Sequence, residues 1–187
     1  MPIGRLEVPA LPVMIPLGIA LMIVAALVLR RRGELTRSRF VAVSLAGWYA
    51  VAVLGATMLP LRLFWGPGAG EPELYRILLI PFVTMRPDDF VLNVAMTLPL
   101  AAALRVVFGL RDRGRVVLTG FLLSLGIETT QLLILVFLHG NRWADTNDLI
   151  ANTLGAWLGW LALRRLLTVP AVRELLERRQ AEPAARS

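Results

Sequence analysis

Six polar residues lie close together in a stretch that is otherwise apolar, between residues 127 and 159. They are Glu128, Gln131, Arg142, Asp145, Asp148 and Asn152. Carboxylates and amides can hydrogen-bond hydroxyl or amino groups, and an arginine can bind a carboxylate or phosphate through two parallel hydrogen bonds. Because such groups are costly in apolar surroundings, we expect them to pair with one another or to serve a function.

The same residues could hold a metal ion, although the sequence predicts no cofactor. If a divalent cation binds, its candidate ligands are Glu128, Asp145 and Asp148, whose oxygen atoms suit magnesium or calcium better than zinc. The chain has no cysteine, which excludes a thiolate metal site. His139 is its single histidine, and no nucleophile stands beside an evident base, so catalytic residues stay unknown and a non-enzymatic role is favoured.

The composition indicates that these residues are positioned by membrane-spanning helices. The 187 residues are 57% hydrophobic, with a net charge of +7 and a mean hydropathy of +0.67. All 20 basic residues are arginines, and they fall in short clusters beside apolar runs instead of forming a continuous stripe. We therefore expect membrane lipids as partners and no nucleic acid.

Five apolar segments are long enough to cross a bilayer, which takes about 20 helical residues. They cover 9–29, 40–61, 90–108, 116–138 and 149–167. The connections after the first and third segments and the region after the fifth, together with Arg105, Arg164 and Arg165, hold 15 of the 20 arginines. By the positive-inside rule, the N-terminus is outside and the C-terminus is cytoplasmic. The expected fold is an all-α polytopic transmembrane helical bundle of about five spans.

We expect one membrane domain over residues 1–187, with four parts. These are an N-terminal two-helix hairpin (1–61), an extracytoplasmic loop (62–89), a core (90–167) and a cytoplasmic tail (168–187). The loop contains the apolar run "LYRILLIPF", which is too short to span and could form an interfacial helix, re-enter the membrane or cap the bundle. The sequence predicts that the tail begins as a short charged helix and ends in a disordered segment.

Helical geometry brings the polar residues to similar depths in the outer half of the membrane. Asn93 lies about one turn below the outer end of the third segment, and Glu128 roughly 15 Å below the outer end of the fourth. Steps of three and four residues place Glu128 with Gln131 on one helix face, and Asp148 with Asn152 on another. We therefore expect a single polar cavity that opens outward.

Simpler interpretations remain open for several of these residues. Gly155 and Gly159 form a GxxxG step that is typical of close helix packing. Either Asp145 or Asp148 could cap the fifth helix, and Glu128 could form a structural pair with Arg142 or Asn152.

Three stretches together resemble the VanZ-like membrane proteins. They are "NVAMTLPLAAAL" from Asn93, "SLGIETTQ" from Ser124 and "GNRWADTNDLIANTLGAWLG" from Gly140, and "LIPF" at 79–82 resembles the family's loop signature. The resemblance implies a multi-pass protein of the bacterial plasma membrane, in a family named for a member that gives resistance to the glycopeptide teicoplanin. It implies no reaction.

Three functions fit these observations. The first is a non-catalytic envelope protein that binds a lipid-linked cell-wall intermediate or a surface ligand and alters glycopeptide susceptibility. The second is a metal-assisted enzyme acting on a lipid phosphate or glycan intermediate. The third is a small transporter or proton-coupled carrier, in which a homo-oligomer would supply the symmetry that five spans lack.

Overall fold

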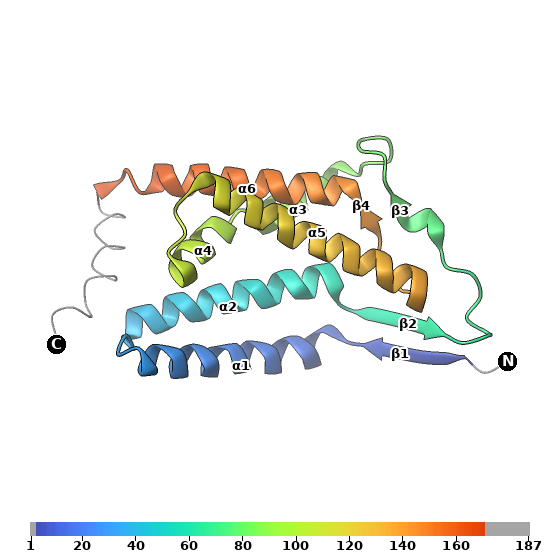
Figure 1. The fold of residues 1–187 in the computed structure, drawn as a ribbon, viewed down its shortest axis with the longest axis horizontal. Helices are drawn as coiled ribbons and strands as arrows, with labels where there is room; N and C mark the ends of the chain where they lie inside the picture. Colours follow the sequence, from blue (N-terminus) through green and yellow to red (C-terminus); the bar gives the residue numbers. More distant parts are fainter. Residues whose placement is uncertain (1–2, 171–187) are drawn as a thin grey trace.

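The computed structural model describes residues 3–170 (Figure 1). In its N-terminal part, two apolar helices form a hairpin. Helix α1 (Ala10–Arg31) is followed by a tight turn in which Gly33 has a φ of 67°, a conformation that favours glycine. Helix α2 (Arg37–Met58) then runs back along α1, and the hydroxyl of Thr36 caps it by accepting a hydrogen bond from its backbone.

The third predicted segment is two helices, α3 (Pro87–Thr97) and α4 (Leu100–Phe108). We expected one continuous helix over 90–108, but Pro99 has no backbone N–H to donate and interrupts the hydrogen-bond ladder. Gly109 ends α4 in the left-handed conformation, at a φ of 68°.

Two long helices complete the bundle, α5 (Arg113–Leu138) and α6 (Thr146–Leu166). The carboxylate of Asp112 caps α5 by accepting a hydrogen bond of 2.9 Å from the backbone N–H of Arg115. Helix α5 ends at His139, a non-glycine residue with a positive φ of 46°.

Within residues 3–170, four helical segments are long and apolar enough to cross a membrane. They are Ala10–Arg31, Arg37–Met58, Pro87–Phe108 and Arg113–Leu138. Helix α6 has 21 residues but begins with a polar turn and ends with two arginines, and it is not among the four. The fifth span and the sides on which the two termini lie therefore stay predictions.

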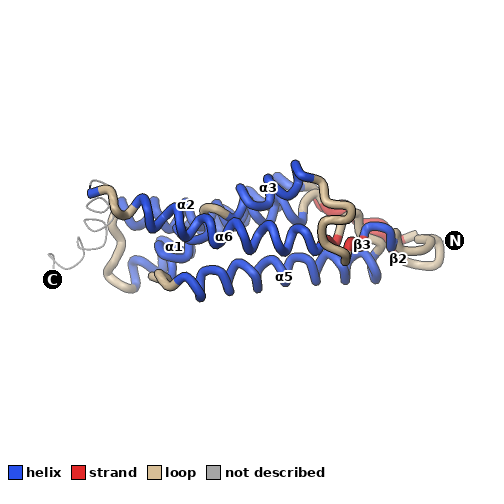
Figure 2. Tube along the Cα trace, turned by 90° about the horizontal axis from the view of Figure 1, so that it is seen from above, coloured by secondary structure: helices blue, strands red, loops and turns tan. Residues whose placement is uncertain are grey.

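The described chain is mostly helical, as predicted, but two small β-sheets at one end of the bundle mean that it is not purely α (Figures 1 and 2). Strand β1 (Gly4–Val8) pairs antiparallel with β2 (Leu61–Trp65), with Glu7 opposite Arg62. The two side chains form an ion pair of 3.0 Å, and the hydrogen bond from Arg62 lowers the pKa of Glu7 below its ordinary value. The strands form because both segments continue beyond the ends of the hairpin helices and leave their backbones free to pair.

The interfacial helix considered for the 62–89 loop does not form. After strand β2, the loop contains the three-residue 3-10 helix η1 (Leu74–Arg76) and strand β3 (Ile77–Leu78), which pairs in parallel with β4 (Ala144–Asp145). Pro81 and then Phe82, whose φ is 66°, turn the chain immediately afterwards. This apolar run therefore lies beside the start of α6.

Helix α6 packs against α3, α4 and α5 (Figures 1 and 2). A small apolar core forms on it, from Leu100, Ala101, Leu104, Val116 and Ala156. Gly155 lies against Thr97 and the backbone of Val94, and Gly159 lies against the carbonyl oxygen of Leu98. Neither glycine has room for a Cβ atom, so the backbones of α6 and α3 meet directly.

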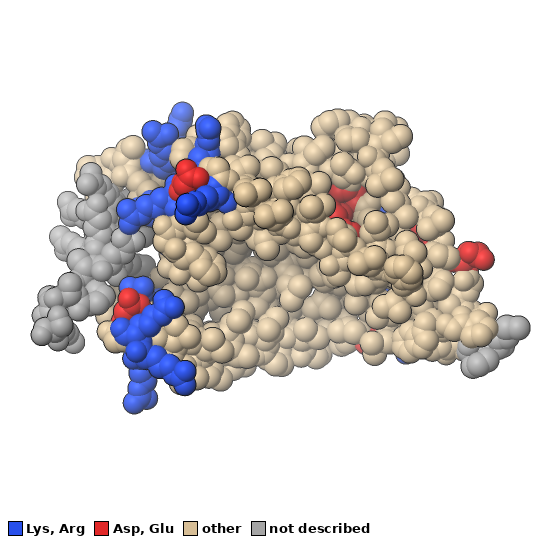
Figure 3. Space-filling model, viewed as in Figure 1, with Lys and Arg blue, Asp and Glu red and all other residues tan. Residues whose placement is uncertain are grey.

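Most of the described arginine side chains gather at the end of the bundle opposite the sheets (Figure 3). They lie over the α1–α2 and α4–α5 connections, as the clustering in the sequence predicts. The expected cytoplasmic tail, from residue 171 onward, lies outside the described residues.

Replacing Gly155 with alanine should therefore destabilise the protein, because the added methyl group must displace the α3 backbone. We expect the free energy of unfolding to fall by about 1–3 kcal/mol. The matched control is Gly126→Ala on α5, where a Cβ atom meets nothing within 4 Å. Thermal unfolding of the detergent-solubilised proteins measures the difference, and equal melting temperatures for the two variants would contradict this packing.

Candidate functional site

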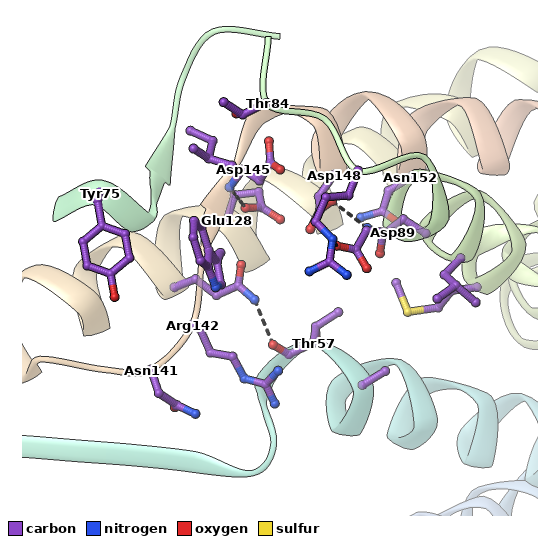
Figure 4. A pocket seen from close by; sticks show the side chains of 18 residues that line it. Thr57, Tyr75, Thr84, Asp89, Glu128, Asn141, Arg142, Asp145, Asp148 and Asn152 are labelled. Atoms are coloured by element: carbon purple, nitrogen blue, oxygen red, sulfur yellow. Dashed lines mark hydrogen bonds and ion pairs between the residues drawn. The ribbon is translucent and has the colours of Figure 1, made fainter. Parts of the chain in front are cut away.

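A cavity of about 970 Å³ lies among α2, α3, α5, α6 and the loops at the sheet end of the bundle (Figure 4). All seven residues that the sequence predicts for a polar site line it: Asn93, Glu128, Gln131, Arg142, Asp145, Asp148 and Asn152. In Figure 4, Arg142 and Thr57 lie across the cavity from Asp145 and Asp148. The structure thus brings the seven side chains to one place.

Glu128 binds the start of helix α6 and does not form either of the side-chain pairs considered for it. Its carboxylate accepts a hydrogen bond of 2.8 Å from the backbone N–H of Asp145. Within residues 3–170, the structure shows no hydrogen bond or ion pair from Glu128 to Arg142 or Asn152. The polar partner of this carboxylate is a peptide group, which sequence spacing does not reveal.

Asp145 and Asn147 together organise the first turn of α6. The Asp145 carboxylate caps the helix by accepting hydrogen bonds from the backbone and side-chain N–H groups of Asn147, at 2.7 and 2.8 Å. The Asn147 amide oxygen in turn accepts a 2.8 Å hydrogen bond from the backbone of Phe82. Asn147 is only 2% exposed, so this side chain fixes the strained Phe82 turn to α6.

Two amide side chains connect α6 to neighbouring helices. The Asn93 side chain on α3 donates a hydrogen bond of 2.6 Å to the carboxylate of Asp148. One turn further along α6, the Asn152 side chain donates to the hydroxyl of Ser124 on α5, at 2.9 Å, and both residues are buried. The walls of the cavity are therefore held to one another by polar contacts.

Gln131 and Arg142 bind backbone carbonyl groups where α2 ends. The Gln131 amide donates to the carbonyl oxygen of Thr57 at 2.8 Å, and the Arg142 guanidinium donates to those of Leu59 and Pro60. The sequence suggested a carboxylate or phosphate as the partner of Arg142, but the chain reversal after α2 places these carbonyls within its reach. Burial lowers the pKa of Arg142 from its usual value.

Three buried polar atoms of the site have no hydrogen-bond partner in the part of the chain that the structure describes. They are Gln131 Oε1, Arg142 Nε and Asn152 Oδ1. A buried polar atom without a partner costs about 1–3 kcal/mol. Since all three residues line the same cavity, a polar molecule bound there can satisfy these atoms.

The carboxylates of the site are not arranged as a metal centre. Glu128, Asp145 and Asp148 line one cavity, yet residues 3–170 contain no group of three or more acidic, histidine or cysteine residues placed to hold an ion. The hypothesis of a divalent cation on these three residues gains no support from their geometry.

Several residues of the site did not emerge from the sequence. Arg86, Asp89 and Thr57 also line the cavity, and Arg86 forms an ion pair of 3.2 Å with Asp89. Asp89 precedes Asn93 by four residues, so helical spacing could have identified it. Thr57 contributes its backbone carbonyl, and no sequence pattern indicates that.

The contacts of Asn147 predict the effect of removing its side chain. In Asn147→Ala, the backbone N–H of Phe82 loses its partner, and we expect a loss of about 1–3 kcal/mol in the free energy of unfolding. Limited proteolysis should also cut the 66–86 loop faster. Thr153→Ala is the control, since Thr153 donates only to the carbonyl of Leu149 in its own helix. An unchanged cleavage rate in Asn147→Ala would refute the anchoring role.

Comparison with known proteins adds one finding to this geometry. Residues 46–168 match the VanZ/LLP1 family. No curated protein and no solved structure gave a match. The matched range covers more than half of the chain and includes every residue that lines the cavity, from Ala56 to Asn152. The chain therefore belongs to the VanZ/LLP1 family of proteins.

Proposed function

We propose that this protein binds a lipid-linked or surface ligand in the cavity and thereby changes susceptibility to teicoplanin-type glycopeptides, in the plasma membrane of a bacterium. Its apolar helices and its family support a membrane protein of the VanZ type. The observation that carries the binding role is the set of buried, unpartnered atoms on Gln131, Arg142 and Asn152, which come from three different segments. A purely structural cluster would be expected to satisfy its own hydrogen bonds.

The charges of the cavity favour a ligand rich in hydrogen-bond donors. Its acidic residues are Asp89, Glu128, Asp145 and Asp148, against the two arginines Arg86 and Arg142. Arg86 is already engaged by Asp88 and Asp89, and Arg142 by backbone carbonyls. Hydroxyl and amino groups, such as those of a sugar or an amine on a lipid carrier, therefore suit this site better than a bare phosphate.

The enzymatic alternative finds less support in the site. A metal-assisted reaction on a lipid phosphate needs several carboxylates around one ion, and the described residues show no such group. The oxygen atoms of Glu128 and Asp145 are instead used to hold the first turn of α6. We therefore propose a binding protein rather than a hydrolase or transferase.

The test of this proposal uses substitutions that keep shape and change charge. Glu128→Gln retains an oxygen to accept the N–H of Asp145, and Asp148→Asn retains one near Asn93. We expect each variant to insert and fold but to lose most of the increase in minimal inhibitory concentration of teicoplanin that the wild-type chain confers on a susceptible bacterium. Glu71→Gln, in the exposed part of the loop, is the matched control and should keep the increase.

A binding measurement on the purified protein tests ligand binding directly, independently of the resistance phenotype. Purified protein in detergent is titrated with a lipid-linked disaccharide, and its melting temperature should rise for the wild type and for Glu71→Gln but not for the two cavity variants. Full resistance together with an undiminished thermal shift in Glu128→Gln and Asp148→Asn would disprove the proposed site.

A further inference from the structure

A second cavity lies at the arginine-rich end of the bundle, between α2 and α4. Its volume is about 720 Å³, and the residues that line it run from Arg32 to Tyr49 and from Pro99 to Arg111. It shares no lining residue with the site described above. The two cavities are separated where the Tyr49 hydroxyl donates a hydrogen bond of 3.1 Å to the carbonyl oxygen of Met96.

The polar rim of this second cavity is basic. Four arginines line it: Arg32, Arg39, Arg105 and Arg111. Among residues 3–170, no acidic side chain belongs to its lining. Figure 3 shows the basic side chains in two groups, over the α1–α2 and the α4–α5 connections, and the surface between them is hollowed. This distribution attracts an anion to the mouth of the cavity.

Of the four arginines that line this cavity, Arg105 is the one with a buried side-chain atom that lacks a hydrogen-bond partner among the described residues. Its Nε atom is buried and has no hydrogen-bond partner in the described part of the chain. Arg39, in contrast, already forms an ion pair of 3.0 Å with Glu34, on a neighbouring turn outside the lining. A phosphate oxygen beside Arg105 would supply a charge-assisted hydrogen bond to this unpartnered group.

Apart from the arginines, the lining of this cavity is mostly apolar. The cavity exists because small side chains face each other across it. They are Ala42 and Ala46 on α2, and Ala102 and Ala103 on α4. Leu45, on the same lining, is 65% exposed on a helix apolar enough to span a membrane, so this side of the cavity faces lipid. An elongated hydrocarbon chain fits such a slot better than a polar molecule.

We propose that this cavity binds an anionic phospholipid of the surrounding membrane. Its phosphate lies among Arg105, Arg39 and Arg32, and one acyl chain lies along the alanine-lined slot between α2 and α4. Basic pockets between membrane helices recognise anionic head groups in this way, and the positive-inside rule places this end of the bundle at the anionic cytoplasmic surface. The bound lipid fills the gap between the N-terminal hairpin and α4.

The experiment compares lipids on the purified full-length chain in a neutral detergent. Melting temperature is measured while phosphatidylglycerol, phosphatidylcholine or inorganic phosphate is added, and native mass spectrometry counts the bound lipids. We expect phosphatidylglycerol alone to raise the melting temperature and to remain bound as one molecule. An equal effect of phosphatidylcholine would overturn the proposal, because it would show a general effect of phospholipids. An equal effect of inorganic phosphate would also overturn it, because it would show a simple anion site.

Matched variants test the position of the lipid. Arg39→Gln with Arg105→Gln should weaken apparent phosphatidylglycerol affinity by about tenfold or more, because charge-assisted hydrogen bonds are lost. Arg31→Gln with Arg165→Gln makes the same charge change on exposed arginines outside the lining and should leave the affinity unchanged. Equal weakening in both double variants would mean diffuse attraction and would refute a defined site.

A third variant covers the case in which the Arg39 and Arg105 substitutions prevent folding. Ala46→Leu with Ala103→Leu fills the slot and keeps every arginine. It should fold, retain the basic surface and bind phosphatidylglycerol no better than phosphatidylcholine. Undiminished binding of phosphatidylglycerol by this filled variant would show that the acyl chain does not lie between α2 and α4.

Discussion

The first turn of helix α6 is held by hydrogen bonds from three other segments, and the remaining architecture depends on this attachment. Glu128 on α5 binds the backbone of Asp145, Asn93 on α3 binds Asp148, and Asn147 binds the loop at Phe82. Each of these bonds is partly buried, and a polar group that loses its partner in such a place is costly. Helix α6 is therefore fixed at this end by directional hydrogen bonds, in addition to the packing along its length.

These same hydrogen bonds position the walls of the polar cavity. Glu128, Asp148 and Asn93 are lining residues as well as attachment points, so the shape of the site and the stability of the bundle are coupled. The cavity nevertheless keeps buried polar atoms on Gln131, Arg142 and Asn152 that the described chain does not satisfy. Some polar groups of the site thus hold the helices together, and others are left without a partner in residues 3–170 and are available to a ligand.

The approximate helix positions and many of the polar residues that line the cavity follow from the sequence, whereas the hydrogen-bond pairings do not. Hydropathy predicts the helices, and helical depth and spacing predict that Asn93, Glu128 and Asp148 share one cavity. Which atom binds which could not be predicted, because Glu128 and Arg142 both bind peptide groups, and every residue carries those. The strands were missed for a similar reason, since their pairing depends on where the chain returns after α2 and α5.

Helices α1 and α6 differ in how much of their surface contacts the rest of the protein, and we expect them to differ in how well they tolerate substitutions. Helix α1 packs mainly on α2, and only 6% of its apolar window is buried within the described chain. Where a side chain meets only hydrocarbon, one apolar residue serves as well as another. Gly18 is an exception, because the Trp48 ring leaves it no room for a Cβ atom. Sequence drift should therefore accumulate in α1 and spare α6, where nearly every turn has a specified neighbour.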